Sequence, residues 1–416
     1  MNVHRPIAVE DDFAVWWSDY LRGRNAPDDL HAPQLRIVDL FGSAGGFGLG
    51  ASLAAQAFGR RAVFGAVVDT DADALGVYER SLPVRSTWAR SVSMLVDHSV
   101  DYDEDKAAFD YPPEILDAAF AEELGRADLL IAGPPCQGHS NLNNHSRRDD
   151  PRNELFVSAV AIAIAGDVPA VVIENVPSVV NAKEGVVQTA RDLLEDAGYA
   201  VAMGVLRMDV LGGWQTRRRF FLLAVRGGDS DRLQTAVDAW RSSAGHAPSK
   251  ARDPLSSLWA IEDLQDMLGA APFGQPPVQK EENVLRIAAL FENDTHDTPN
   301  ELRPDCHKDG TSYGAVYGRM HADRPAPTIT TGIGTPGQGR FVHPTRPRMV
   351  TPHEAARLQG FPDGHDFMGG DKTTRKSLAK WIGDAVPPML GAIACGLVLE
   401  QTFDACFRPP WTTDGG

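Results

Sequence analysis

The sequence LRIVDLFGSAGGFGLG at residues 35–50 decides the fold class of this 416-residue chain. It begins with a run of apolar residues that ends at Asp39, Leu40 and Phe41, and it continues with a stretch rich in glycine. Glycines between a strand and a helix let the backbone approach a cofactor, and the helix N-terminus favours negative charge. We therefore predict a strand over residues 35–41 that leads into a cofactor-binding turn.

The same alternation of short apolar segments and helical patterns continues beyond this turn. Apolar segments follow at 62–68, 127–133, 169–176 and 218–225, with helical stretches between them. Short buried strands that alternate with helices indicate the α/β class with a parallel, doubly wound sheet.

Two stretches interrupt this alternation. Residues 97–127 are acidic and predict a surface insert before a strand, whereas residues 227–320 carry Pro and Gly breakers and predict a smaller subdomain. Beyond them, 351–361 and 387–403 are expected to form helices, the first with an entry that proline restricts.

Charge and cysteine content restrict the class of protein. The chain carries 40 basic and 56 acidic residues, a net charge of −16, which disfavours a surface that coats nucleic acid but allows a local basic cleft. Four cysteines are too few for a disulfide framework, as expected in a reducing compartment. There is no secretory apolar region at the start, and the longest apolar stretch, about 155–165, is too short to cross a bilayer. We expect a soluble, cytoplasmic protein without a membrane partner.

Acidic residues and a cysteine stand at the ends of the expected strands. Asp69 ends the second strand, 19 residues after Gly50, where an acid suits ribose hydroxyls or alternatively caps a helix. Cys136 follows Pro134 and Pro135 at a strand end, and a polar, partly basic loop comes after it. A loop thiol in an electropositive setting is a candidate nucleophile, whereas the other three cysteines fit simple packing.

Two further motifs carry ionisable groups. Glu174 ends the strand at 169–176 and is either structural or a proton donor with a raised pKa. In the sequence QTRRR at 215–219, strand alternation puts Arg217 and Arg219 on one face, which suggests recognition of an anion or a base edge.

Taken in order, these motifs resemble those of the DNA (cytosine-5)-methyltransferases. The resemblance covers residues 35–225 and 319–399 and rests on DLF-x-x-x-GG, GPPCQG-x-S, ENV, Q-x-R-x-R, TPHEAARLQGFPD and GDAVPP. It implies a Rossmann-like sheet that binds S-adenosylmethionine and a small target-recognition subdomain. It divides the chain into an N-terminal extension (1–34), a catalytic domain (35–226), a target-recognition region (227–345) and a C-terminal part that returns to the catalytic domain (346–416).

The resemblance also implies a role for each motif. Cys136 would add to carbon 6 of a cytosine flipped out of double-stranded DNA, Glu174 would act at N3, and Arg219 would hold O2 with support from Arg217. The implied cofactor contacts are Phe41, Gly45, Gly46, Asp69, Pro134, Asp384, Ala385 and Val386. The implied DNA contacts are Gln137, Ser140, Asn144, Arg147, Arg148, Gln215, Arg319 and Arg340.

Within the recognition region, residues 305–343 are expected to read the target sequence, with Arg319 and Arg340 as leading candidates. Cys306 and His307 do not form a metal site by spacing, so no metal is expected.

Some positions depart from the family pattern. Ser43, Ser91 and His139 replace the usual glycine, aspartate and phenylalanine, and Asp384 replaces an asparagine. These departures bear on cofactor affinity and on the identity of the transferred group. Two alternatives stay open, an RNA (tRNA) cytosine-5 methyltransferase and a catalytically silent DNA-binding regulator. A restriction-modification or phage-defence system is the expected context.

Overall fold

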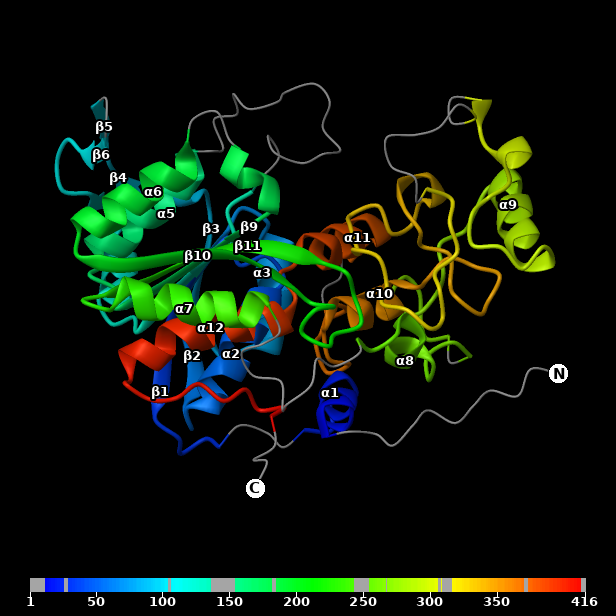
Figure 1. Cartoon of the computed structure of the whole chain (residues 1–416), viewed down its shortest axis with the longest axis horizontal. Helices are drawn as coiled ribbons and strands as arrows, with labels where there is room; N and C mark the ends of the chain where they lie inside the picture. Colours follow the sequence, from blue (N-terminus) through cyan, green and yellow to red (C-terminus); the bar gives the residue numbers. More distant parts are fainter. Residues whose placement is uncertain are drawn as a thin grey trace.

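A seven-stranded sheet forms the centre of the larger lobe, in the order β10-β11-β9-β8-β1-β2-β3 (Figure 1). The computed structural model describes residues 12–25, 29–103, 106–135, 154–181, 185–242, 254–266, 268–305, 308, 316–369 and 373–412. The strands of the sheet are β1 (Gln34–Leu40), β2 (Arg61–Asp69), β3 (Val84–Ala89), β8 (Leu129–Ala132), β9 (Ala170–Asn175), β10 (Tyr199–Arg207) and β11 (Arg218–Arg226). The predicted α/β sheet is confirmed, and β3 and β10 are added to it.

One strand, β11, runs against all the others. It pairs antiparallel with both β9 and β10, whereas the remaining pairs are parallel. The expected parallel, doubly wound sheet is thus found, except that the two pairs of β11 are antiparallel. The reason is the short connection between β10 and β11, because a parallel neighbour needs a crossover of a dozen or more residues.

Helices cover both faces of the sheet. One face packs against α2 (Gly46–Ala57), α3 (Ala72–Ser81), α7 (Ser230–Arg241) and α12 (Pro388–Thr402). The other face packs against α4 (Ala118–Leu124), α5 (Glu154–Ala165) and α6 (Val186–Asp196). Strands such as β9 are buried on both faces, which explains their unbroken apolar sequences.

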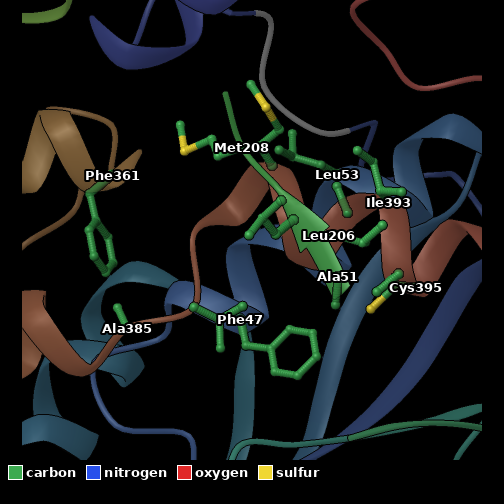
Figure 2. Packing of buried hydrophobic residues seen from close by; sticks show 14 of the residues in the cluster. Phe47, Ala51, Leu53, Leu206, Met208, Phe361, Ala385, Ile393 and Cys395 are labelled. Carbon is green, nitrogen blue, oxygen red and sulfur yellow. The ribbon is translucent and has the colours of Figure 1, made fainter. Parts of the chain in front are cut away.

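The helices α2 and α12 touch almost backbone to backbone. A side chain at Gly50 would lie 2.7 Å from the carbonyl oxygen of Pro388 and 2.8 Å from the Cα atom of Gly391. Around this contact, Phe47, Ala51 and Ile393 build the core of this face, as Figure 2 shows. The C-terminal helix is thus packed directly behind the glycine-rich turn, although more than 330 residues separate them in the sequence.

The predicted surface insert contains two small antiparallel strand pairs, one inside the other, and it ends in α4, which packs on the sheet. The strands β4 (Val96–Asp97) and β7 (Glu114–Ile115) pair antiparallel, and so do β5 (Val100–Asp103) and β6 (Lys106–Phe109). The short 3₁₀ turn η1 (Val92–Met94) precedes them.

The smaller lobe has little regular structure. It contains α8 (Ser257–Ile261), α9 (Glu281–Glu292), α10 (Pro352–Gln359) and α11 (Arg375–Asp384), with α9 at its outer edge (Figure 1). It also contains the 3₁₀ turns η4 (Asn300–Leu302) and η6 (Pro336–Gln338), whereas η3 (Pro177–Asn181) follows β9 in the larger lobe. The helix predicted at 351–361 is confirmed. Thr351 and Glu354 form a capping box, and Pro352 occupies the first turn.

The N-terminal region is part of the folded core. Helix α1 (Asp12–Leu21) buries Trp17 and Leu21 completely. The Trp17 ring lies 5.3 Å from that of Trp214 and 4.8 Å from that of Trp411. The N-terminal extension expected over residues 1–34 therefore contains a helix that belongs to the core. The sequence DFAVWWSDYL already carried the signal, because its aromatic residues recur at helical spacing.

The boundary between the two lobes also differs from the one expected at residue 226. Helix α7 lies on the sheet, where Gln234 accepts a hydrogen bond from the backbone N–H of Met203 and Val237 fills the space beside Gly204. The division between the lobes thus falls after Arg241, because α7 needs the sheet to bury its apolar side.

One described stretch, residues 375–402, is apolar and long enough to span a membrane by composition. It comprises α11 and α12, and 94% of its most apolar part is buried inside the protein, as expected of a core helix.

Candidate functional site

The candidate site lies at the carboxyl ends of the parallel strands. The strand order reverses between β1 and β8, and open α/β sheets place their ligands at such a switch point. The turn after β1, the end of β2, the turn after β8 and the end of β9 all meet at this edge. The motifs predicted from the sequence are therefore brought together by topology.

The turn after β1 has an unusual backbone. Phe41 has a φ angle of +65°, Ser43 of +46° and Gly45 of +90°, and Gly45 caps helix α2. Ser43 thus adopts a left-handed conformation that a non-glycine residue adopts only when the surroundings impose it. Its backbone N–H donates a 2.9 Å hydrogen bond to Oδ2 of Asp69, which fixes this conformation.

The lack of a side chain at Gly46 lets the C-terminal segment pack against the start of α2. A side chain there would lie 2.8 Å from the carbonyl oxygen of Val386 and 2.9 Å from Cβ of Ala385. The C-terminal residues Ala385 and Val386 thereby pack against the start of α2. Ala385 and Phe361 lie on the same side of Phe47 in Figure 2.

Asp69 organises the base of this turn. Its carboxylate also accepts a 2.8 Å hydrogen bond from the N–H of Asp71, in addition to the one from Ser43. Burial raises the pKa of Asp69, and these two hydrogen bonds oppose the shift. A carboxylate has about four acceptor positions, so two remain for a ligand. The Oγ atom of Ser43, nearby, is buried and has no hydrogen-bond partner among the described residues.

Glu174 and Arg219 form a partly shielded ion pair at the end of β9. Nε of Arg219 lies 2.6 Å from Oε1 of Glu174, and Glu174 is only 7% exposed. Burial raises the pKa of Glu174, and the positive charges of Arg219 and Arg217 oppose this. The raised pKa agrees with the proton-donor alternative predicted from the sequence.

The turn after β8 lies beside this pair. The N–H of Gly133 donates to the carbonyl of Leu40, and the side-chain amide of Asn175 donates a 3.2 Å bond to the carbonyl of Pro134. A side chain on Gly133 would lie 3.8 Å from Oε2 of Glu174. The asparagine of the ENV motif thus orients the Pro-Pro turn, a role the sequence analysis missed.

Cys136 lies just outside the described residues, as do Gln137, Ser140, Asn144, Arg147 and Arg148. The predicted specificity positions Cys306 and His307 also lie outside the described residues.

Gln215 and Arg217 do not face a ligand. Both are buried, and they bind protein groups of three different segments. One guanidinium nitrogen of Arg217 donates to the carbonyl of Ile329 and the other to that of Gly383, at 2.5 and 2.8 Å. The expectation that Gln215 contacts DNA is wrong in this structure. It ignored the smaller lobe, which covers the start of β11.

Arg319 and Arg340 are likewise held by the protein. Arg319 stacks over the Phe291 ring at 4.2 Å and donates a 2.8 Å bond to the carbonyl of Pro344. Arg340 donates 2.6 Å bonds to the carbonyl of His296 and to Asp297. These bonds use several donors of both arginines to stabilise the recognition region, and base readout by Arg319 and Arg340 stays a prediction.

The remaining predicted positions lie around the same edge. Asp384 ends α11 with a side chain about half exposed, 4.0 Å from the Lys380 ammonium. Partial burial raises its pKa, and the charges of Lys380, Arg217 and Arg219 oppose the shift. Ser91 caps η1, where its hydroxyl contacts that of Ser93. The described residues hold no group of three or more His, Cys, Asp or Glu side chains arranged for a metal ion.

Comparisons with known proteins define the class. Residues 35–395 match the model of the C-5 cytosine-specific DNA methylase family, and the chain belongs to this family of DNA (cytosine-5)-methyltransferases. It is 37% identical to the type II methyltransferase M1.BsuMI of Bacillus subtilis, over 92% of this chain and 84% of that protein. It is 32% identical to the type II methylase M.HgiDII of Herpetosiphon aurantiacus, over 64% of this chain and 74% of that protein.

Solved structures agree on the fold. The S. pombe Dnmt2 methyltransferase has a TM-score of 0.54 and 15% identity, and the match covers 88% of this chain and 98% of the other. An Escherichia coli prophage-encoded protein described as a DNA modification methyltransferase has a TM-score of 0.58 and 21% identity, covering 88% and 99% of the two chains.

Proposed function

We propose that the protein methylates carbon 5 of cytosine in double-stranded DNA with S-adenosylmethionine as the methyl donor. The observation that carries this proposal is the Glu174–Arg219 pair beside the Pro-Pro turn that leads into Cys136. A nucleophile, a proton donor and a fixed cation are the three groups that activation of a pyrimidine ring requires.

Carbon 5 of cytosine is a weak nucleophile, so addition must first occur at carbon 6. The Cys136 thiolate forms a bond to carbon 6, and the ring electrons move towards N3. Glu174 donates a proton or hydrogen bond at N3, a role that burial supports because it raises the pKa of this carboxyl group, and Arg219 binds O2. When bound, the cofactor supplies an electrophilic methyl group. Carbon 5 would receive this methyl group, with S-adenosylhomocysteine as the leaving group. Transfer of the carbon 5 proton to water and cleavage of the carbon–sulfur bond would then restore the Cys136 thiolate.

The cofactor fits the turn after β1. The two remaining acceptor positions of Asp69 suit ribose hydroxyls, and the Oγ atom of Ser43 supplies a buried hydroxyl that still needs a partner. Phe41 and the segment 383–386 supply the apolar walls. The serine departure at position 43 thus adds a polar group to the pocket and removes none.

A cytosine must leave the duplex to react here. Glu174 is 7% exposed at the sheet edge, so a base inside the duplex cannot reach it without being flipped out. The loop of residues 137–153 would hold the opened duplex, with Asn144, Arg147 and Arg148 as DNA contacts.

The biological setting follows from the relatives. Two of them are named as type II enzymes, so we place this protein in a restriction-modification or phage-defence system, acting on DNA in the cytoplasm. Bisulfite sequencing of DNA from cells that express the protein would give the methylated motif, and tRNA from the same cells serves as the alternative substrate.

A covalent trap tests the mechanism. Duplex DNA with 5-fluorocytosine at the target should form a stable adduct in the presence of S-adenosylmethionine, because fluorine cannot leave carbon 5 as a proton does. Denaturing gels and mass spectrometry should show the adduct for wild type and for Cys406→Ser, which alters an exposed cysteine. Cys136→Ser should form none, and an undiminished adduct in that variant would overturn the assignment.

A further inference from the structure

Four side chains around the start of β11 connect segments that are far apart in sequence. Gln215 forms an isolated β-bridge with Ala326, so the residues that lead into β11 lie against the recognition region. Trp214 donates from its indole nitrogen to the carbonyls of Arg357 and Leu358 in α10. The entry to β11 is therefore enclosed by both the recognition region and the C-terminal part.

The amides of Gln215 and Gln359 form a continuous chain. Gln215 donates a 3.0 Å bond to Oε1 of Gln359 and accepts a 3.2 Å bond from the N–H of Ile329. Gln359 in turn donates a 2.5 Å bond to the carbonyl of Ala385. Both glutamines are fully buried, so water cannot replace these partners.

Arg217 makes a second connection to the same segment. It is 1% exposed and joins the carbonyl of Gly383 to that of Ile329. A side chain on Gly383 would collide with the backbone of Thr330 and Thr331, so the recognition region lies directly behind this segment. We use the term brace for Gln215, Arg217 and Gln359 with these hydrogen bonds.

We propose that the brace positions the segment 383–386 against the glycine-rich turn, and that Gln215, Arg217 and Gln359 thereby determine the affinity for the methyl donor. The inference rests on the proposed function. It gives the motif Q-x-R a positioning role on the cofactor side of the site. The physical reason is that Ala385 and Val386 follow the end of α11 and have no regular structure to pair their carbonyls, so other groups must do so, as the Gln359 amide does for Ala385.

The test compares Gln359→Met and Arg217→Lys with Tyr199→Phe in the full chain. Met lacks the amide that binds Ala385, and Lys can reach only one of two carbonyls while keeping the charge. Tyr199→Phe removes a buried 2.8 Å hydrogen bond to the carbonyl of Val168, at the opposite end of the sheet, and is the matched control. Calorimetry with S-adenosylhomocysteine, steady-state kinetics and urea unfolding are measured for each.

Gln359→Met should weaken S-adenosylhomocysteine binding about 10-fold, the effect of one unpaired buried carbonyl, and raise KM for the methyl donor more than it lowers kcat. Arg217→Lys should show a smaller shift in the same direction, and it serves as the test if Gln359→Met does not fold. Tyr199→Phe should lose stability but keep its affinity. If the brace variants bind as tightly as the control, the proposal is wrong. If wild type binds no S-adenosylhomocysteine, the proposed function itself fails.

Discussion

At the scale of single residues, buried carboxyl groups distinguish this site. Glu174 keeps a raised pKa although Arg219 lies beside it, because loss of hydration outweighs the nearby charge. Asp39 of the DLF motif is a second case, because it is 1% exposed and accepts a 2.7 Å hydrogen bond from the hydroxyl of Tyr78. Tyr78 packs beneath Gly42, Gly45 and Gly48, so this pair supports the glycine-rich turn from below.

Burial of Asp39 predicts a pH-dependent stability. Burial raises the pKa of Asp39 to about 8, while the unfolded chain ionises it near its ordinary value. The stabilisation that comes from burying the neutral Asp39 side chain is therefore fully present when the pH is below the ordinary pKa. It is lost as the pH rises towards 8. Asp39→Asn keeps an acceptor for Tyr78 but does not ionise, so its free energy of unfolding should change less with pH. At pH 8 the free energy of unfolding of the variant should exceed that of wild type by a few kcal/mol, and at pH 4 the two values should agree.

Urea unfolding at several pH values measures this difference. Asp238→Asn, on the exposed surface of α7, is the control and should follow wild type. Parallel pH profiles for wild type and Asp39→Asn would contradict the prediction.

At the scale of elements, helix α12 makes the glycine-rich turn possible. It supplies the wall behind α2 and connects through Pro387 and Pro388 to the segment 383–386. The two helices approach at Gly50 and Gly391, where neither carries a side chain. Close backbone approach thus determines how tightly the C-terminal part closes on the site.

Gly50→Ala should push α2 and α12 apart. The new methyl would meet backbone atoms of Pro388, Gly391 and Ala392 that cannot move aside alone. Overpacking of this kind costs ~1–3 kcal/mol, so thermal unfolding should occur at a lower temperature. Gly76→Ala, within α3, faces only the flexible end of Arg80 and should instead gain roughly 0.5–1 kcal/mol from helix propensity. Equal effects for the two variants would rule out the packing argument.

At the scale of the whole molecule, aromatic residues from distant segments join the two chain ends. Trp17 of α1 packs with Trp214 before β11 and with Trp411 near the C-terminus. An ion pair between Arg22 and Asp263 at 2.9 Å ties the same helix to the smaller lobe. The N-terminal helix is therefore part of the support beneath the brace.

Trp17→Ala should destabilise the whole chain. Removal of a fully buried indole leaves a cavity and costs ~3–5 kcal/mol, so the urea midpoint should fall markedly. Val15→Ala, on the exposed side of α1, should change stability little. A small effect of Trp17→Ala would mean that α1 contributes little to the fold.

The sequence by itself determined the α/β class, the strand ends and the identity of the chemical groups. These features depend on local periodicity, on turn residues and on ordered motifs, all of which a linear sequence carries. Asp69, Glu174 and Arg219 accordingly reach the sheet edge where they were expected.

Only the tertiary structure decided what each polar side chain faces. Gln215, Arg217, Arg319 and Arg340 were expected to contact DNA or a base, yet carbonyls of distant segments take up their donors. The direction of β11 and the burial of α1 were likewise decided by long-range packing. The physical reason is that a buried polar group must find a partner, and for Gln215 and Arg217 the partners lie more than 100 residues away in the sequence.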